Sequence, residues 1–138
     1  MFAGAKLALL LDGAVLAYFR DDLDHIPFPG HWDLPGGGRE GDETAEACVL
    51  RELEEEFGLC LEPERLLWRR EYASLHLPGR GAVFFAGYLR AQEVEAIRFG
   101  PEGQRWLLMP VGDFVAHPLA VPALRHRVAE FLEHASLG

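Results

Sequence analysis

The sequence predicts an α/β fold in which a mixed β-sheet is covered by helices on its faces. Two observations lead to this prediction. Apolar runs with strand character alternate with segments of helical periodicity, and no internal repeat, low-complexity tract or linker interrupts the 138 residues. A chain of this length can bury roughly two thirds of the surface that its unfolded form exposes, so one core is sufficient. We therefore expect residues 1–138 to form a single domain.

The chain opens with two apolar runs, residues 3–11 and 14–20. The Asp-Gly dipeptide between them is among the strongest short-range signals for a β-hairpin. Residues 21–42 then collect Asp, Pro and Gly around a short expected strand at 32–34. Loops of this length in compact domains usually carry a function. This segment is therefore the first place to expect a site.

A helix is predicted from Thr44 to Phe57. Either Asp42 or Thr44 is expected to cap its start, because a short polar side chain there accepts a hydrogen bond from a free backbone N–H. Gly58 lies just beyond its end, where glycine adopts the left-handed conformation that stops a helix. Apolar residues four positions apart should form one buried stripe, which consists of Val49, Leu53 and Phe57.

In the second half of the chain, segments with strand character are again followed by a segment of helical periodicity. Aromatic and β-branched residues flank a Pro-Gly-Arg-Gly segment, which predicts a second hairpin with a loop of four or five residues. The last segment repeats apolar residues at helical spacing and is expected to pack on the core. The predicted elements are strands at 66–76, 82–90 and 105–109 and a helix at 121–134.

The charge balance limits the partners of the protein. Its 22 acidic residues outnumber its 13 basic residues, and the net charge of -9 repels polyanions. A small phosphorylated substrate is compatible with this charge if divalent cations mask the carboxylates locally. We therefore expect no double-stranded nucleic acid as the main partner.

The cysteines and the apolar runs indicate the compartment. Cys48 and Cys60 are the only cysteines and form no CxxC pair, so we expect two buried free thiols rather than a disulfide or a zinc site. No run approaches the roughly 18 apolar residues that span a bilayer. The amino-terminal segment lacks the cleavage pattern of a signal peptide. We expect a cytoplasmic protein with no membrane partner.

Carboxylates are concentrated at the end of the predicted helix, where Glu52, Glu54, Glu55 and Glu56 occupy four of five positions. Residues three or four apart face each other on a helix, so each such pair of like charges costs on the order of 0.2 to 0.5 kcal/mol. The negative end of the helix dipole adds a similar penalty. A solvated acidic face is one explanation of this run. The other is a bound divalent cation, because Mg²⁺ prefers carboxylate, water and phosphate oxygens.

The spacing around the run favours the cation, because it resembles the Nudix box at every defined position. A chance match in a shuffled chain is on the order of one in a million, so the motif is specific. Residues 32–38 also resemble the strand and glycine loop that precede the box in that family. The resemblance implies the Nudix-type α/β/α sandwich with a mixed sheet. The matching residues are Gly37, Glu43, Arg51-Glu52-Leu53, Glu55-Glu56 and Gly58-Leu59.

By this resemblance, the box carries a metal site. Glu55 and Glu56 are expected as the principal ligands, with Glu52 and the Gly36 carbonyl oxygen in the same set. Glu102 resembles the additional carboxylate of MutT-like members, although an ordinary turn glutamate is the alternative for this position. The implied cofactor is Mg²⁺, with Mn²⁺ as a substitute.

The resemblance also implies roles in catalysis. Arg51 and Glu43 are expected to form an ion pair that ties the glycine loop to the helix, and Arg51 precedes Glu55 by four residues, so it can orient that carboxylate. The general base is Glu52 or Glu102, and we rank Glu52 first. Glu54 points away from this face and should be solvated. The expected catalytic set is Arg51, Glu52, Glu55, Glu56 and Glu102.

The implied reaction is hydrolysis of a phosphoanhydride bond in a nucleoside diphosphate linked to another group. A normal or oxidised (deoxy)nucleoside triphosphate, cleaved to a nucleoside monophosphate and pyrophosphate, is preferred because Glu102 matches the MutT-like arrangement. A nucleotide sugar or ADP-ribose is the alternative substrate, although the proline placement of ADP-ribose hydrolases is not found in this sequence.

Three other functions stay open at this point. A catalytically silent Nudix module would bind a nucleotide only, but it would not need the complete set of glutamates. An enzyme acting on the 5′ end of RNA would need a basic channel, and the sequence shows no such concentration of charge. A structural calcium-binding protein would need the regular ligand spacing of an EF-hand, which this sequence lacks.

Substrate contacts are expected from the strand end and the long loop. Arg20 is positioned to meet a phosphate or a base, and Trp32 offers a surface for stacking, as do Phe28 and His31. A surface arginine and partly buried aromatic residues explain these positions equally well. A homodimer is expected only by analogy with the fold.

Overall fold

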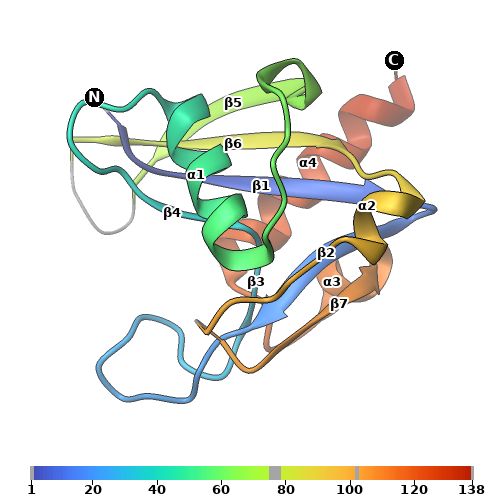
Figure 1. Ribbon diagram of the computed structural model, residues 1–138, viewed down its shortest axis with the longest axis horizontal. Coiled ribbons are helices and arrows are strands. Elements are labelled where there is room, and N and C mark those ends of the chain that lie inside the picture. Colours follow the sequence, from blue (N-terminus) through green and yellow to red (C-terminus); the bar gives the residue numbers. More distant parts are fainter. Residues whose placement is uncertain (1, 75–78, 102, 138) are drawn as a thin grey trace.

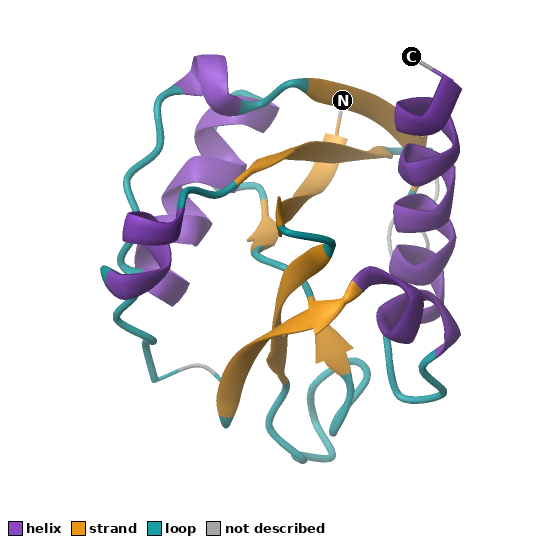
Figure 2. Cartoon of the chain, turned by 90° about the vertical axis from the view of Figure 1, so that its right-hand side faces the viewer, coloured by secondary structure: helices purple, strands orange, loops and turns teal. Residues whose placement is uncertain are grey.

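The structure is a computed structural model that describes residues 2–74, 79–101 and 103–137. The strands form one mixed sheet, and helices cover both of its faces (Figures 1 and 2), which confirms the predicted fold class. The strands are β1 (Phe2–Leu11), β2 (Ala14–Phe19), β3 (Trp32–Asp33), β4 (Gly36–Gly38), β5 (Trp68–Ala73), β6 (Gly81–Tyr88) and β7 (Arg105–Pro110). The helices are α1 (Ala45–Phe57), the 3-10 helix η1 (Pro63–Arg65), α2 (Ala91–Glu95), α3 (Val111–Ala116) and α4 (Pro122–Leu137).

The first two strands form the predicted hairpin. Asp12 and Gly13 join them, and their φ angles of 49° and 78° are both positive, as the favoured two-residue turn requires. Only Leu10 and Leu11 of β1 pair with β2. β2 then pairs with β7 along its full length, so it carries the sheet away from β1.

β1 is the strand at which both halves of the sheet meet. One edge of β1 pairs in parallel with β6. The other edge pairs antiparallel with β4 near the start of β1 and with β2 near its end. The sheet is therefore mixed, as predicted, and β4 is held directly by the central strand.

β4 lies where a glycine loop was predicted, so this prediction was wrong. Gly36, Gly37 and Gly38 form a strand that pairs with residues 4–6 of β1. The two backbones approach so closely that a Cβ atom at Gly36 would lie 2.1 Å from the Ala5 carbonyl oxygen. Glycines are typical of loops, but here they allow a close approach of two strands.

α1 begins and ends at the residues that the sequence predicts. Thr44, rather than Asp42, is the cap, because its Oγ1 accepts a hydrogen bond from the Ala47 N–H at 3.1 Å. Gly58 ends the helix with a φ angle of 67°. The predicted buried stripe is also confirmed, since the side chains of Val49, Leu53 and Phe57 are fully buried.

The sheet has an apolar core on each face. Alternate residues of β1 point to opposite faces, so Leu7 and Leu9 pack with α1, whereas Ala8 and Leu10 pack with the α4 side. Figure 2 shows α1 and α4 on opposite sides of the strands. The residues of α4 in this core are Leu124, Val128 and Phe131.

The second hairpin is confirmed by the antiparallel pairing of β5 with β6, although residues 75–78 of the predicted strand and loop lie outside the described residues. The short helices η1, α2 and α3 were not predicted. η1 and α2 bury no residue, so they carry no apolar periodicity that a sequence could reveal. None of the described helices has the length and apolar character needed to cross a membrane.

The prediction of two buried thiols is confirmed for Cys48 and wrong for Cys60. Cys48 is fully buried on α1, whereas Cys60 is exposed just after the helix. Cys60 follows the left-handed Gly58, where the chain leaves the helix, so it does not continue the buried face of α1.

The close contact between β4 and β1 gives a stability prediction. Gly36→Ala should lower the free energy of unfolding by about 3 kcal/mol or more, because the new Cβ meets backbone and the φ angle of 134° is unfavourable for alanine. Gly38→Ala is the matched control, since a Cβ there meets no atom within 4 Å. Urea unfolding of both variants checks this. Equal stability of the two variants would contradict the close approach.

Candidate active site

The buried carboxylate of Glu56 joins α1 to β4. Glu56 is 3% exposed, and its Oε1 accepts a hydrogen bond from the Gly36 N–H at 2.9 Å. Burial raises the pKa of Glu56 to about 8, although the Lys6 ammonium and the Gly36 N–H act in the opposite direction. Without a bound cation, the carboxyl group is therefore mostly protonated at pH values below 8.

Glu52 lies one turn earlier on α1 and packs against the next residue of β4. A Cβ atom at Gly37 would lie 2.6 Å from the Glu52 Cδ, so glycine is needed to leave room for this carboxylate. The Glu52 side chain is 13% exposed. β4 thus forms a cradle without side chains, and the carboxylates of Glu52 and Glu56 lie against it.

Arg51 connects the acidic residues around this cradle. Its Nη2 and Nε donate to the two carboxylate oxygens of Glu43 at 2.8 and 3.1 Å, which confirms the predicted ion pair. Its Nη1 donates to Glu52 at 3.1 Å and to Glu55 at 3.2 Å. The hydrogen bonds from Arg51, together with the Glu40 N–H, lower the pKa of Glu43 to about 2. One guanidinium therefore offsets much of the repulsion between these carboxylates.

The acidic residues of α1 form an oxygen-rich set that suits a hard cation. As their side chains stand, no three His, Cys, Asp or Glu groups among residues 2–74, 79–101 and 103–137 converge on one point. The chemistry nevertheless fits Mg²⁺, because Glu52 and Glu56 lie against adjacent glycines that leave space beside them. Glu55 is 54% exposed at the same helix end, and Glu54 is exposed, as predicted.

The two other expected ligands are the Gly36 carbonyl oxygen and Glu102. The Gly36 carbonyl oxygen accepts a hydrogen bond from the Lys6 Nζ at 3.3 Å, so a side-chain cation already lies beside it. Glu102 lies outside the described residues. Its expected roles as an additional ligand or general base stay predictions.

A buried aspartate binds two cations next to β4. Oδ2 of Asp33 accepts hydrogen bonds from the Lys6 Nζ at 3.0 Å, from the Arg20 Nη1 at 2.8 Å and from the Tyr18 hydroxyl at 3.3 Å. Burial raises the pKa of Asp33, but Lys6 and Arg20 outweigh this effect and hold the pKa below its ordinary value. Asp33 is therefore ionised, and the cluster carries one more positive than negative charge.

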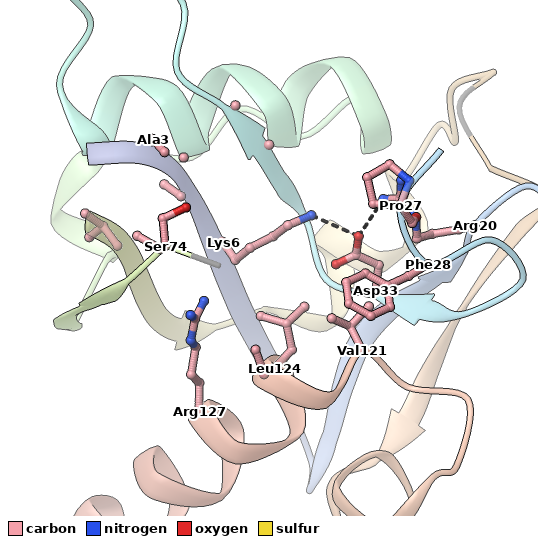
Figure 3. A pocket seen from close by; sticks show the side chains of 17 residues that line it. Ala3, Lys6, Arg20, Pro27, Phe28, Asp33, Ser74, Val121, Leu124 and Arg127 are labelled. Atoms are coloured by element: carbon pink, nitrogen blue, oxygen red, sulfur yellow. Dashed lines mark hydrogen bonds and ion pairs between the residues drawn. The ribbon is translucent and has the colours of Figure 1, made fainter. Parts of the chain in front are cut away.

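This cluster lies at one end of a cavity of about 340 Å³ between β1, β4 and α4 (Figure 3). Lys6, Arg20 and Arg127 line the cavity, and Asp33 is the one carboxylate among the lining residues. Gly37 and Gly38 line its β4 side, so the carboxylates of α1 lie directly behind this wall. Apolar walls are formed by Phe28, Val83, Val121 and Leu124.

Of the residues predicted to contact the substrate, some line the cavity and others do not. Arg20 and Phe28 line the cavity. Trp32 is 5% exposed and packs in the core against Phe19, with 5.0 Å between ring centroids, and it is not a lining residue. His31 interacts through its Nδ1 with the Pro29 carbonyl and also does not line the cavity.

Three charged residues of the site were not predicted from the sequence. Lys6 is the one lysine of the chain and interrupts an apolar strand, which is a signal that a cation points into a special environment. Asp33 ends the short strand β3 and stands between two buried residues. Arg127 lies three residues after Leu124 and four before Phe131, so it is on the inner face of α4. In each case the signal was a charge within an apolar pattern.

Comparison with known proteins relates this site to a protein family. The NUDIX domain profile matches residues 4–131 of the chain. The solved structure of the MutT protein from Methanosarcina mazei Go1 superposes with a TM-score of 0.76 at 21% identity and covers 96% of this chain and 93% of that chain. This likeness shows the same fold.

Curated relatives match shorter segments. The nucleoside triphosphatase NudI of Enterobacter sp. (strain 638) is 54% identical over 39 residues, which is 28% of each chain. The RNA pyrophosphohydrolase of Zymomonas mobilis subsp. mobilis is 35% identical over 96 residues, 65% of this chain and 57% of the relative. The matches to such relatives span between 27% and 57% of the relatives' own lengths.

The raised pKa of Glu56 predicts a pH dependence of stability. Because the folded protein holds this proton more tightly than the unfolded chain, whose pKa is 4.5, the contribution is complete below pH 4.5 and is lost as the pH rises through about 8. The loss should approach about 1.4 kcal/mol per pH unit within this window. Glu56→Gln, which stays neutral, should remove it.

Urea unfolding in EDTA at pH 5, 6.5 and 8 measures this effect. Glu54→Gln, an exposed glutamate of the same helix, is the control and should keep the wild-type slope. A Glu56→Gln variant with the same pH slope as the wild type would show that Glu56 titrates normally.

Proposed function

This chain belongs to the NUDIX domain family, and from this premise we propose that it hydrolyses a phosphoanhydride bond in a nucleoside diphosphate linked to another group. One observation carries the proposal: β4 separates the buried carboxylates of α1 from a cavity with excess positive charge. In a chain with a net charge of -9, a cavity lined by three cations and one carboxylate favours an anionic ligand. The acidic helix end behind it supplies groups for hydrolysis.

The proposed substrate is a normal or oxidised (deoxy)nucleoside triphosphate, which is cleaved to a nucleoside monophosphate and pyrophosphate. The cavity volume of about 340 Å³ is in the range of small-molecule sites. Val83, Val121 and Leu124 provide apolar surface against which a base can pack. The name of one relative, a nucleoside triphosphatase, supports the same substrate class. Nucleotide sugars and ADP-ribose are the alternative substrates.

The residues of the cavity have distinct proposed tasks. Lys6 and Arg20 attract the phosphates, since Asp33 neutralises only one of their two charges. Glu52 lies behind the β4 wall and is the general base that takes a proton from the attacking water, because its carboxylate contacts Gly37, which lines the cavity. The second cavity cation, Arg20, also holds the Pro27 carbonyl, which fixes the loop at the cavity edge.

The helix end supplies positioning and ligand groups. Arg51 holds Glu52 and Glu55 through its Nη1 and is a positioning residue. Glu52, Glu55, Glu56 and the Gly36 carbonyl would hold Mg²⁺, or Mn²⁺ in its place, with Glu102 as the additional ligand. The chemistry that the cation supplies when bound is neutralisation of the charge that develops on the phosphates.

Other properties stay predictions. They are a single domain over residues 1–138, a cytoplasmic location, a homodimer, and the absence of membrane and double-stranded nucleic acid partners. A catalytically silent nucleotide-binding module is the rival function, and turnover separates it from the proposed enzyme.

The test is the release of pyrophosphate or phosphate from nucleoside triphosphates, nucleotide sugars and ADP-ribose in the presence of Mg²⁺. We expect turnover of triphosphates, and we expect Glu52→Gln, Glu55→Gln and Glu56→Gln each to lower kcat/KM at least about 100-fold. Glu54→Gln removes a charge from the same helix at an exposed position and should stay within about twofold of the wild type.

Two other outcomes of this assay would change the proposed substrate or the proposed function. Preferred turnover of a nucleotide sugar or ADP-ribose would replace the proposed substrate and keep the reaction. Nucleotide binding without turnover of any compound would establish the silent module instead.

A further inference from the structure

Arg127 is a buried cation on the cavity wall that forms no ion pair with the described residues. It is 9% exposed, and its guanidinium carbon lies 4.6 Å from the centre of the Tyr72 ring. In Figure 3 its side chain reaches from α4 toward Ser74 on the opposite side of the cavity. Within residues 2–74, 79–101 and 103–137, its guanidinium makes no ion pair and no hydrogen bond. Burial of such a group is unfavourable, and the Tyr72 ring offsets this cost without accepting a conventional hydrogen bond.

The nearby carboxylates are occupied by other residues. Glu130 lies one turn further along α4, but its oxygens accept a hydrogen bond from the Tyr72 hydroxyl and pair with Arg70 at 3.5 Å. Asp33, the carboxylate among the cavity-lining residues, is shared by Lys6 and Arg20. The carboxylates near Arg127 are thus engaged elsewhere, and its N–H groups stay available to acceptors on a ligand in the cavity.

The surroundings of Arg127 favour a flat, weakly solvated group over a phosphate. Ala82 and Val83 of β6 and Leu124 of α4 line the same cavity with apolar side chains. The phosphates of the proposed substrate belong beside Gly37 and Gly38, where the α1 carboxylates lie behind the wall. The remaining part of the substrate that can reach Arg127 is the base.

We propose that Arg127 is a specificity-determining residue that selects guanine through its O6 and N7 acceptors. The planar guanidinium donates two parallel hydrogen bonds to adjacent acceptors, and guanine presents such a pair. Adenine presents an amino group beside N7, so one N–H of Arg127 would face another donor. This inference rests on the proposed function, because it assigns the base of that substrate.

The same geometry distinguishes guanine from its oxidised form. In 8-oxoguanine, N7 carries a hydrogen and no longer accepts a hydrogen bond, so only O6 remains for Arg127. Of the normal and oxidised triphosphates in the proposed substrate class, the unoxidised guanine nucleotide is therefore the preferred one.

Calorimetric binding of dGMP, dAMP and 8-oxo-dGMP tests the inference without requiring turnover. The wild type should bind dGMP about tenfold or more tightly than dAMP or 8-oxo-dGMP. In Arg127→Met, the affinity for dGMP should fall while the affinities for dAMP and 8-oxo-dGMP stay unchanged. The three affinities should then agree to within about twofold. Arg127→Lys keeps the charge near Tyr72 but lacks the planar fork, and it should lose the same preference.

Arg70→Met is the matched control. Arg70 also lies over the Tyr72 ring, at 6.0 Å, and pairs with Glu130, but it is outside the cavity lining. The control should keep the guanine preference. Thermal unfolding verifies that each variant is folded. If Arg127→Met does not fold, the comparison of the wild type with Arg127→Lys tests the inference.

The binding measurement tests the role of Arg127, whereas the turnover assay tests the proposed hydrolysis, so either proposal can be overturned without the other. An unchanged guanine preference in Arg127→Lys, equal weakening of all three nucleotides, or tighter binding of 8-oxo-dGMP than of dGMP would overturn the inference, even if triphosphates are hydrolysed. An Arg127-dependent preference for dGMP in a protein without turnover would support the inference and overturn the proposed hydrolysis.

Discussion

The close approach of β4 to both β1 and α1 is the constraint on which the rest of the site depends. Gly36 leaves no room for a Cβ on the β1 side, and Gly37 leaves none on the α1 side. A strand without side chains therefore joins the central strand of the sheet to the helix. Its N–H groups and its empty faces position the carboxylates of Glu52 and Glu56, which would otherwise be solvated on the surface of α1.

Charge is separated across this thin strand. On the α1 side, Arg51 offsets the repulsion of neighbouring glutamates that the helix alone would disfavour. On the cavity side, Lys6 and Arg20 share the buried Asp33 and leave a positive excess. The acidic side suits cations and the basic side suits phosphates, so the strand joins two complementary environments within a few ångströms. This arrangement explains how an acidic protein can attract an anionic substrate.

Local signals accounted for the elements that the sequence predicted correctly. The Asp-Gly turn, the Thr44 cap and the Gly58 stop each act within a few residues, and the structure confirms all three. The errors arose where distant contacts override a local signal. Glycines that favour a loop form β4 because β1 is beside them, and Cys60 is exposed because the chain has left α1. Trp32, a residue proposed for stacking, packs in the core because β3 pairs with β2 there.

The sequence by itself determined the spacing of the glutamates, the helix that presents them and the family that this spacing resembles, because these features lie within one continuous segment from Gly37 to Leu59. Only the tertiary structure decided which cations share a cavity with that segment. Lys6 meets Asp33 across 27 residues of chain, and Arg127 joins them from the last helix. Such contacts depend on the order of strands in the sheet and on the face that α4 covers, which no local pattern encodes.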